Sequence, residues 1–268
     1  VNNVCNLNCK HCRVSEKNDK EQLSLVQAKM LLAELWYEGV TKLNLSGGEP
    51  FLRKDLFEIL EYARKFDDIV ITTNGTLLNE EVCQKLSEFS NIKLSISLDG
   101  MEKTHDEFRR KKGTFKTVIN NLELLKKYNI SYAIKYTLSK ETIDDVKDLI
   151  KLIAAKGAKE FNIRRVIAVG NANADMLVSN ETYKKIIKEI IQECNELSIN
   201  FKTGDPLLIP IFPEIFGIDL KHDDINKIYA GCQAGDEIIY IDYKGNVGAC
   251  SYIPIFADNI KEKSLDDI

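Results

Sequence analysis

The chain has 268 residues and a formal net charge of -4, with 44% hydrophobic and 29% charged residues, which is the composition of an ordinary globular protein. The charge argues against a general affinity for nucleic acid, and the sequence contains no apolar run near the roughly 18 residues that a membrane helix needs. Seven cysteines, three of them crowded together without a secretory leader in front, favour a reducing cytoplasm over a disulfide framework.

Short β-branched runs alternate with amphipathic stretches from residue 1 to about residue 170, which predicts a series of βα units. We expect six strands, at residues 1–4, 42–46, 69–73, 93–98, 132–138 and 160–167. Helices are expected between them at residues 57–66, 80–89, 115–128 and 143–156. Another helix is predicted to begin after a Ser24 cap and to stop at Gly39, with an apolar face made of Val26, Met30, Ala33, Trp36 and Tyr37.

Strands joined by helical crossovers run parallel, so the predicted fold class is α/β, and six such units can wind either into a barrel or into an open doubly wound sheet. Of the two, we predict a partial (β/α)6 TIM-like barrel over residues 1–170. Both a barrel and an open sheet gather their functional loops at the carboxyl ends of the strands. We therefore expect the motifs that follow those strands to meet at one rim.

The pattern changes after residue 170. Residues 171–230 are predicted to hold a helix over residues 181–196 and a proline-rich connector over residues 201–217. Residues 231–268 contain a predicted hairpin over residues 237–252 with a YKGN turn. The chain begins four residues before its first cysteine and stops at SLDDI, from which we expect that both natural ends have been trimmed.

Three cysteines, Cys5, Cys9 and Cys12, have the spacing C-x3-C-x2-C. A structural zinc ion takes four ligands, commonly in pairs, and no second pair lies nearby; His11 is a further donor, but Cys12 already occupies that turn. A cubane iron-sulfur cluster has four irons that each need one outside ligand, so three thiolates leave one iron open to a small molecule. The spacing therefore favours a cluster over zinc.

The stretch CNLNCKHC resembles the cluster-binding loop of the radical S-adenosylmethionine (radical SAM) superfamily. The resemblance implies that Cys5, Cys9 and Cys12 bind a [4Fe-4S] cluster whose open iron is chelated by SAM. In that family, an electron from the cluster cleaves SAM to methionine and a 5′-deoxyadenosyl radical, which removes a hydrogen atom from the substrate. His11 matches a site usually held by an aromatic residue, where it would shield the cluster or stack on adenine.

Two motifs follow the second and third predicted strands. In LNLSGGEP, Gly47 and Gly48 allow bare backbone to approach a ligand, and Glu49 can accept a hydrogen bond from an ammonium group. The resemblance places this segment at the methionine amino group of SAM. In TTNGT, Asn74 either contacts SAM or only forms a turn with Gly75, and the sequence leaves both interpretations open.

The fourth predicted strand ends in SISLDG, where Ser95, Ser97 and Asp99 share one side by period two. The resemblance places Ser97 at SAM and makes Asp99 a second candidate. The next stretch, HDEFRRKKGTF, resembles the H-D-x-x-R…G-x-F segment of the peptide-modifying branch, which implies that Arg109 pairs with the SAM carboxylate. Its neighbours at 110–112 are expected to be solvated. Thr137 and either Arg164 or Arg165 are also expected at the same rim, without assigned contacts.

The remaining four cysteines fall into two groups. Cys83 and Cys194 lie in helical patterns among apolar neighbours, which predicts buried packing. Cys232 and Cys250 form a C-x12-G-x4-C pattern that resembles the opening of a SPASM (or twitch) domain. The resemblance implies that they bind auxiliary iron-sulfur clusters together with later cysteines. The alternative is a disulfide, or two reduced thiols, across the hairpin.

The resemblance implies a radical SAM enzyme, and the open side of a six-unit barrel would admit a peptide or protein segment for oxidation or cross-linking. A haem or other tetrapyrrole precursor is the second candidate substrate, because haem-pathway enzymes resemble the same subfamily. A reducing partner such as a flavodoxin or ferredoxin is implied as the electron donor. A third possibility, from another class, is a non-catalytic iron-sulfur or zinc protein, for which the GGEP and SISLDG segments and Arg109 would have no use.

Overall fold

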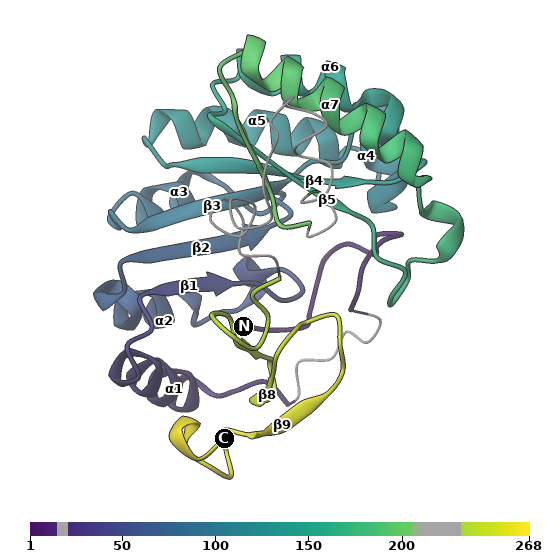
Figure 1. The fold of residues 1–268 in the computed structure, drawn as a ribbon. Helices are drawn as coiled ribbons and strands as arrows, with labels where there is room; N and C mark the ends of the chain where they lie inside the picture. The colour runs from purple at the N-terminus through teal and green to yellow at the C-terminus, as the bar shows by residue number, and fades with distance from the viewer. Residues whose placement is uncertain (15–20, 206–207, 209–231) are drawn as a thin grey trace.

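The computed structural model describes residues 1–14, 21–205, 208 and 232–268 (Figure 1). Its centre is a sheet of parallel strands that follow one another in sequence order. The strands are β1 (Lys42–Leu45), β2 (Asp68–Thr73), β3 (Ile92–Ser97), β4 (Tyr132–Leu138), β5 (Glu160–Arg165) and β6 (Asn200–Thr203). This order confirms the predicted α/β class and the winding of βα units into a partial barrel.

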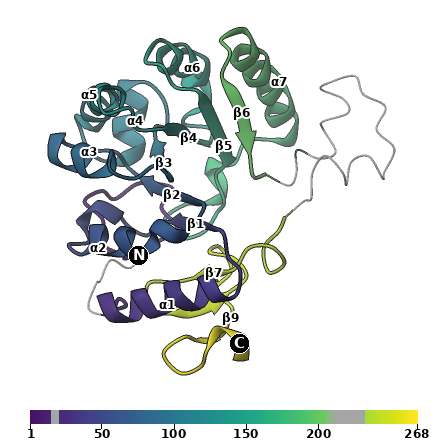
Figure 2. The same ribbon diagram turned by 90° about the vertical axis from the view of Figure 1, so that its left-hand side faces the viewer.

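Helices cover the outer face of the curved sheet (Figure 2). The α-helices are α1 (Leu25–Tyr37), α2 (Leu56–Tyr62), α3 (Glu80–Leu86), α4 (Glu102–Arg109), α5 (Thr114–Lys127), α6 (Val146–Ala155) and α7 (Asn180–Glu196). Short 3-10 helices are η1 (Pro50–Leu52), η2 (Ala63–Lys65), η3 (Ile143–Asp145), η4 (Ala174–Met176) and η6 (Leu265–Asp267). A separate antiparallel sheet consists of β7 (Tyr240–Ile241), β8 (Asn246–Gly248) and β9 (Phe256–Asn259).

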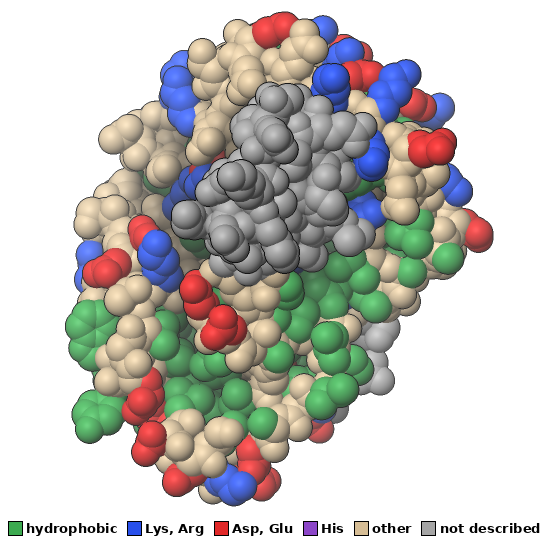
Figure 3. All heavy atoms as spheres, in the orientation of Figure 1, with side chains coloured by type: hydrophobic (Ala, Val, Ile, Leu, Met, Phe, Trp, Pro, Cys, Tyr) green, Lys and Arg blue, Asp and Glu red, His purple; other side chains and the backbone are tan. Residues whose placement is uncertain are grey.

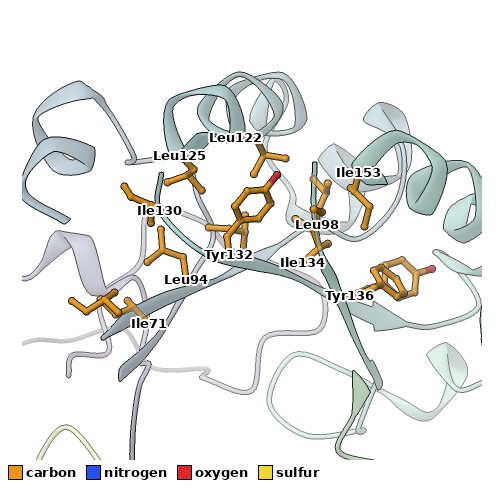
Figure 4. Close-up of a cluster of buried hydrophobic side chains, with 14 of the residues drawn as sticks. Ile71, Leu94, Leu98, Leu122, Leu125, Ile130, Tyr132, Ile134, Tyr136 and Ile153 are labelled. Carbon is orange, nitrogen blue, oxygen red and sulfur yellow. The ribbon is translucent and has the colours of Figure 1, made fainter. Parts of the chain in front are cut away.

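The two faces of the main sheet differ in polarity because side chains alternate along each strand. On the outer face, side chains such as Leu94 and Ile134 are fully buried against the helices (Figure 4). On the inner face of the same two strands lie Ser95, Ser97 and Lys135, and the strand register places Ser97 directly opposite Lys135. The helix-covered face therefore forms the core, and the inner face is left for polar chemistry.

The first predicted strand was wrong. Residues 1–4 form only a single bridge, between Asn2 and Gly47, supported by backbone hydrogen bonds from Gly48 to Asn2 and from Glu49 to Val4. This segment lies beside the irregular turn that follows β1, where no regular ladder can continue. The sixth strand is instead β6, in residues that we expected in the connector. The connector beyond it, at 206–207 and 209–217, lies outside the described residues.

The predicted apolar face of α1 was also wrong. Val26 and Tyr37 are exposed, at 66% and 87%, whereas the buried residues of this helix are Ala28, Leu32 and Leu35. Apolar residues occur around most of this helix, so periodicity did not decide which side faces the core. The Ser24 cap was correct: its side chain accepts a hydrogen bond from the backbone of the third helical residue in a capping box. Exposed apolar side chains remain on the lower half of the face shown in Figure 3.

The HDEFRRKKGTF stretch, residues 105–115, contains the second half of α4 and the start of α5. The predicted hairpin after residue 237 is confirmed by the pairing of β7 with β8, and Gly245 takes a left-handed φ of 98° in its turn. A third strand, β9, adds to the hairpin and was not predicted. No helix in the described part of the chain is both long and apolar enough to span a membrane.

Candidate active site

The cysteine loop is held at the carboxyl ends of the parallel strands by hydrogen bonds to two distant segments. The backbone N–H of Lys10 donates to the Phe108 carbonyl at 2.9 Å, and the Cys12 carbonyl accepts from the Asn171 N–H at 2.8 Å. Asn171 also donates from its side chain to the Cys9 carbonyl, at 3.1 Å. The loop therefore spans from α4 to the segment that follows β5, across the rim where the motifs were expected to meet.

Two of the three thiols receive hydrogen-bond donors from the protein. Cys5 Sγ accepts from the Leu7 N–H at 3.4 Å and from Asn74 Nδ2 at 3.9 Å. Cys9 Sγ accepts from Arg109 Nη1 at 3.8 Å. Burial raises the pKa of the Cys9 thiol, and the Arg109 charge opposes this rise. N–H donors and a cation beside sulfur stabilise a thiolate, which is the form that binds metal.

Gly47 and Gly48 pack against the N-terminal segment. A Cβ atom built on Gly47 would lie 2.1 Å from the Asn2 carbonyl oxygen, and one on Gly48 would lie 2.0 Å from that of Val4. The close backbone approach that we predicted for a ligand is therefore made by the chain itself. Any side chain at either position would displace the segment that leads into Cys5.

Glu49 is fully buried and joins the turn after β1 to the end of β2. Its Oε1 accepts from Thr73 Oγ1 at 2.7 Å and from the Phe51 N–H at 3.3 Å, and its Oε2 accepts from the Asn74 N–H at 2.8 Å. Burial raises the pKa of this carboxyl, while these hydrogen bonds oppose the rise. A carboxylate has about four acceptor positions, so one remains for a further donor.

Asn74 connects the end of β2 to the cysteine loop. Besides approaching Cys5 Sγ, its Nδ2 donates to Asn6 Oδ1 at 2.8 Å, and its Oδ1 accepts from the Thr76 N–H at 2.9 Å. Asn6 in turn donates to Thr76 Oγ1 at 2.9 Å. Asn74 therefore does not only form a turn with Gly75, because its side chain also contacts Asn6 and Cys5 of the cysteine loop.

Asp99 and Arg109 form a buried ion pair. Arg109 Nε and Nη2 both contact Asp99 Oδ2, at 2.7 and 2.5 Å, and Asp99 Oδ1 accepts from the Thr137 N–H at 2.8 Å. Burial alone would raise the pKa of Asp99, but the Arg109 guanidinium holds it below its usual value. Two residues that we predicted as separate SAM contacts are therefore partners of each other, and Thr137 contributes through its backbone.

Two residues of the same motif were missed as site residues. His105 Nδ1 accepts from the Asp99 N–H at 3.1 Å, and its ring meets Phe115 edge-on. Asp106 Oδ1 accepts from Thr114 Oγ1 and from the Phe115 N–H, so it caps the start of α5. The H-D-x-x-R spacing was the available signal: its His and Arg both hold Asp99, and its Asp orders the following helix.

His11 stacks on Phe108, with ring centroids 4.5 Å apart and planes 11° apart. Burial lowers the pKa of His11 to about 4, so its imidazole is neutral. Its Nδ1 is buried and has no hydrogen-bond partner among the described residues. His11 therefore acts as an aromatic ring, as the sequence predicted, and its Nδ1 has no partner among the described residues.

A cavity of about 1350 Å³ lies between the inner face of the sheet and the C-terminal segment. Lys135 and Arg164 line it from β4 and β5, and Cys232 and Cys250 line it from the C-terminal segment. Arg13, next to the cysteine loop, crosses to that segment: its Nη1 donates to the Ser251 carbonyl at 3.2 Å. Lys135 was not predicted as a site residue, because a single lysine in a strand carries no motif.

The other cysteines follow the predictions in part. Cys83 and Cys194 are completely buried in their helices, and burial raises their pKa values to about 11 and about 12. Cys232 and Cys250 are both free thiols, so the structure contains no disulfide between them. Cys250 Sγ accepts from the Tyr252 N–H at 3.5 Å.

The donor set fits an iron-sulfur cluster. No three His, Cys, Asp or Glu side chains of the described residues converge on a position for one metal ion. A four-iron cluster takes one sulfur at each of three separate irons, so its ligands do not have to meet at a point. Cys5, Cys9 and Cys12 lie on one loop, and the sulfur atoms of Cys5 and Cys9 accept hydrogen bonds from N–H donors, which suits thiolate ligands of that kind.

The fold and the site together define a partial α/β barrel with a three-cysteine loop at the carboxyl ends of its strands. The model of the radical SAM superfamily matches residues 1–153, and the chain belongs to this superfamily of enzymes. Membership implies one [4Fe-4S] cluster and SAM as cofactors. Membership of this family of enzymes argues against the third possibility, a non-catalytic iron-sulfur or zinc protein.

Similar proteins include both kinds of enzyme that the sequence suggested. The AdoMet-dependent heme synthase of Methanosarcina barkeri is 31% identical, over 98% of this chain and 78% of its own length. The sporulation killing factor maturation protein SkfB of Bacillus subtilis is 29% identical, over 100% of this chain and 63% of its own length. The chain thus spans less than two thirds of SkfB.

Solved structures confirm the fold. Streptococcus suis SuiB bound to the precursor peptide SuiA superposes with a TM-score of 0.84 at 18% identity, over 99% of this chain and 62% of SuiB. The enzyme anSMEcpe with bound AdoMet superposes with a TM-score of 0.77 at 19% identity, over 99% of this chain and 74% of that one. At these identities the likeness establishes the architecture alone.

Proposed function

We propose that this protein binds a [4Fe-4S] cluster through Cys5, Cys9 and Cys12 and uses it to cleave SAM reductively. When bound, these cofactors supply a 5′-deoxyadenosyl radical that abstracts hydrogen from a substrate. The observation that carries the proposal is the arrangement of the three thiols, with hydrogen-bond donors on Cys5 and Cys9, at the rim of the barrel.

The chain's own residues would hold and order this centre. Arg109 places a cation beside Cys9, and Asp99 fixes the direction of that guanidinium. Burial of both groups keeps water from competing for the pair, so its electrostatic interaction is stronger than at a surface. His11 and its stacked partner Phe108 would shield one side of the cluster or stack on adenine.

Four positions are proposed to contact SAM directly. The remaining acceptor position of Glu49 suits the ammonium group, next to the backbone of Gly47 and Gly48. Ser97, half-buried at the end of β3, offers a hydroxyl on the inner face of the sheet. Asn74, Asp99 and Arg109 would then act mainly as positioning residues, because their polar atoms already bind other residues of the chain.

The test is release of 5′-deoxyadenosine by anaerobically reconstituted protein supplied with dithionite and SAM. We expect release from the wild type and none from Cys9→Ala. Cys83→Ala, which removes a buried thiol far along the chain in α3, is the matched control and should retain both cluster and release. A wild-type protein that holds a full cluster and releases no 5′-deoxyadenosine would overturn the proposal.

The substrate that we favour is a peptide or protein segment, modified by oxidation or cross-linking. The match to SkfB over the whole chain supports this choice, as does the superposition on SuiB with its precursor peptide. A cavity of about 1350 Å³ is larger than most small-molecule sites, which commonly measure roughly 300–1,000 Å³. A peptide fills such a volume readily.

A haem precursor is the second candidate, and the heme synthase of Methanosarcina barkeri favours it through its match to 98% of this chain. The two candidates are separated by turnover assays. Consumption of a supplied metalloporphyrin, coupled to 5′-deoxyadenosine release, would indicate the haem pathway. Consumption of a precursor peptide encoded beside this gene would indicate peptide maturation.

Further parts of the proposal concern the rest of the system. Cys232 and Cys250 are proposed as ligands of auxiliary iron-sulfur clusters, completed by cysteines beyond this chain. The sequence placed the barrel at residues 1–170, a helix and connector at 171–230 and the start of a SPASM domain at 231–268. Because β6 joins the main sheet, the proposed barrel extends through α7 and β6, followed by the connector and the start of the SPASM domain. A flavodoxin or ferredoxin is the proposed electron donor, and the reducing cytoplasm is the proposed compartment.

A further inference from the structure

The inner face of the main sheet carries charged side chains at two levels along the strands. At the amino ends of the strands, Glu160 of β5 lies between Lys93 of β3 and Lys202 of β6. Its Oε2 is 2.7 Å from one ammonium group and 2.8 Å from the other. These two lysines therefore have a carboxylate partner within the barrel wall.

Nearer the carboxyl ends lie two more cations, Lys135 on β4 and Arg164 on β5. The strand register pairs Lys135 with Asn162 and Thr137 with Arg164, so the two cations are one step apart on neighbouring strands of the same face. Both side chains line the cavity. Among the described residues, neither has a carboxylate within ion-pair distance, in contrast to Lys93 and Lys202.

The acidic side chains around the cavity bind other groups. Asp205 accepts from Arg165 Nε at 2.7 Å and from the Tyr183 hydroxyl at 2.7 Å. Asp242 accepts two backbone N–H groups, from Lys244 and Asn246, inside the β7–β8 turn. The third, Glu237, accepts from the Gln233 side chain. Among the residues that the structure describes, the cavity wall thus has a local excess of positive charge at Lys135 and Arg164.

The cysteine loop does not account for this excess. The cation in contact with Cys9 is Arg109, which is already paired with Asp99. Burial, and after it the nearby charge of Arg164 and then Arg13, lowers the pKa of Lys135 to about 8. Half-buried cations that repel one another cost free energy unless an anion binds between them. Gly204 of the chain after β6 leaves space beside Arg164, whose Nη2 would be 3.4 Å from a Cβ at that position.

We propose that Lys135 and Arg164 form a subsite for a carboxylate group of the substrate, in the cavity between the sheet and the C-terminal segment. This inference rests on the proposed function, because it concerns the molecule that the radical attacks. It narrows the substrate to one that carries a carboxylate into the barrel. Both candidate sources meet that condition: an acidic side chain of a peptide, or a carboxylate-bearing porphyrin.

The test measures binding to the cluster-loaded protein in the presence of SAM, without turnover. One pair of probes is a porphyrin tetracarboxylate and its tetramethyl ester. The other is a blocked peptide with one glutamate and its glutamine counterpart. We expect one acid to bind about tenfold or more tightly than its neutral form, the effect of a charge-assisted hydrogen bond. The pair that shows the preference identifies the source of the carboxylate.

Lys135→Gln and Arg164→Gln should each remove that preference. Lys202→Gln is the matched control: it also removes a cation from the inner face, but one whose partner Glu160 keeps Lys93. We expect this control to retain the preference. The dissociation constant for SAM should change less than twofold in Lys135→Gln.

Any of three results would overturn the subsite. Neither acid binds more tightly than its neutral form, or Lys202→Gln loses the preference as fully as Lys135→Gln does. The third result is that Lys135→Gln weakens the binding of SAM by the same factor as it weakens the binding of the acid. In the last case the lysine serves the SAM carboxylate instead. Release of 5′-deoxyadenosine by the wild type, measured separately, tests the proposed function. If the wild type released no 5′-deoxyadenosine but still bound the acid more tightly than its neutral form, the proposed radical chemistry would be rejected and the carboxylate subsite would be retained.

Discussion

Arg109 and Asp99 form a fully buried ion pair at the end of β3, and the same guanidinium reaches the sulfur of Cys9. One arginine thereby couples a carboxylate of the sheet to the loop that is proposed to hold the cluster. Loss of either charge would leave the other buried without a partner, which is the costly case for an internal ion pair.

Arg109→Met should therefore lower the free energy of unfolding by about 3–5 kcal/mol. Adding Asp99→Asn to this variant should recover part of the loss, because no unpaired charge then remains. Urea unfolding of the apo-protein under reducing conditions measures both. Lys112→Met, on the exposed loop after α4, should stay within about 0.5 kcal/mol of the wild type. Equal stability of Arg109→Met and this control would contradict the role of the pair.

His105 should make the protein less stable in mild acid. Burial lowers its pKa from the ordinary 6.5 to about 4, so between these values the unfolded chain binds a proton that the folded chain does not. The free energy of unfolding therefore falls as the pH falls through this window, by at most about 3 kcal/mol from this residue. Unfolding of the apo-protein at pH values from 7 down to about 4.5 measures the slope.

In His105→Asn, the side-chain oxygen can replace Nδ1 as acceptor from the Asp99 N–H without titrating. In this variant, the free energy of unfolding should fall less as the pH is lowered. The contribution of His11, whose pKa is also lowered to about 4, should remain. An unchanged slope in His105→Asn would show that His105 is not the residue that titrates.

Gly48→Ala should prevent cluster assembly. The added Cβ would lie 2.0 Å from the Val4 carbonyl oxygen, so the segment leading to Cys5 would have to move. We expect iron and sulfide contents after reconstitution to fall to a small fraction of the wild-type values. Gly157→Ala is the control: it meets no atom within 4 Å and carries only the strain of a φ of 87°. It should lose about 1 kcal/mol of stability and keep its cluster.

Arg13→Met should loosen the C-terminal segment from the barrel. Arg13 donates to the Ser251 carbonyl and lies over the rings of Tyr240 and Tyr252, at 5.5 and 6.0 Å from their centroids. Losing about 1–2 kcal/mol of such contacts should speed amide exchange in β7 and after Cys250 roughly 5- to 30-fold. Hydrogen exchange read by mass spectrometry measures this. Lys10→Met, on the same loop but paired with Glu141, should leave that segment unchanged.

Much of the fold was predictable from periodicity. Five of the predicted strands overlap β1 to β5, and the four helices between them overlap α2, α3, α5 and α6. The failures share a physical cause. Residues 1–4 have the composition of a strand, but they pair with a turn, and β6 is too short and too close to prolines to show a pattern. In α1, apolar residues lie on most sides of the helix, so the buried face depends on which elements pack against it and cannot be read from periodicity.

The sequence alone predicted the cysteine loop as a cluster-binding segment, because the spacing of Cys5, Cys9 and Cys12 is a local property of one short segment. It also located the Gly-Gly-Glu and H-D-x-x-R segments, for the same reason. Only the tertiary structure decided which charges have partners. Arg109 pairs with Asp99 and Lys202 with Glu160, while Lys135 is left facing a cavity, since strand register brings together residues that are far apart in the chain.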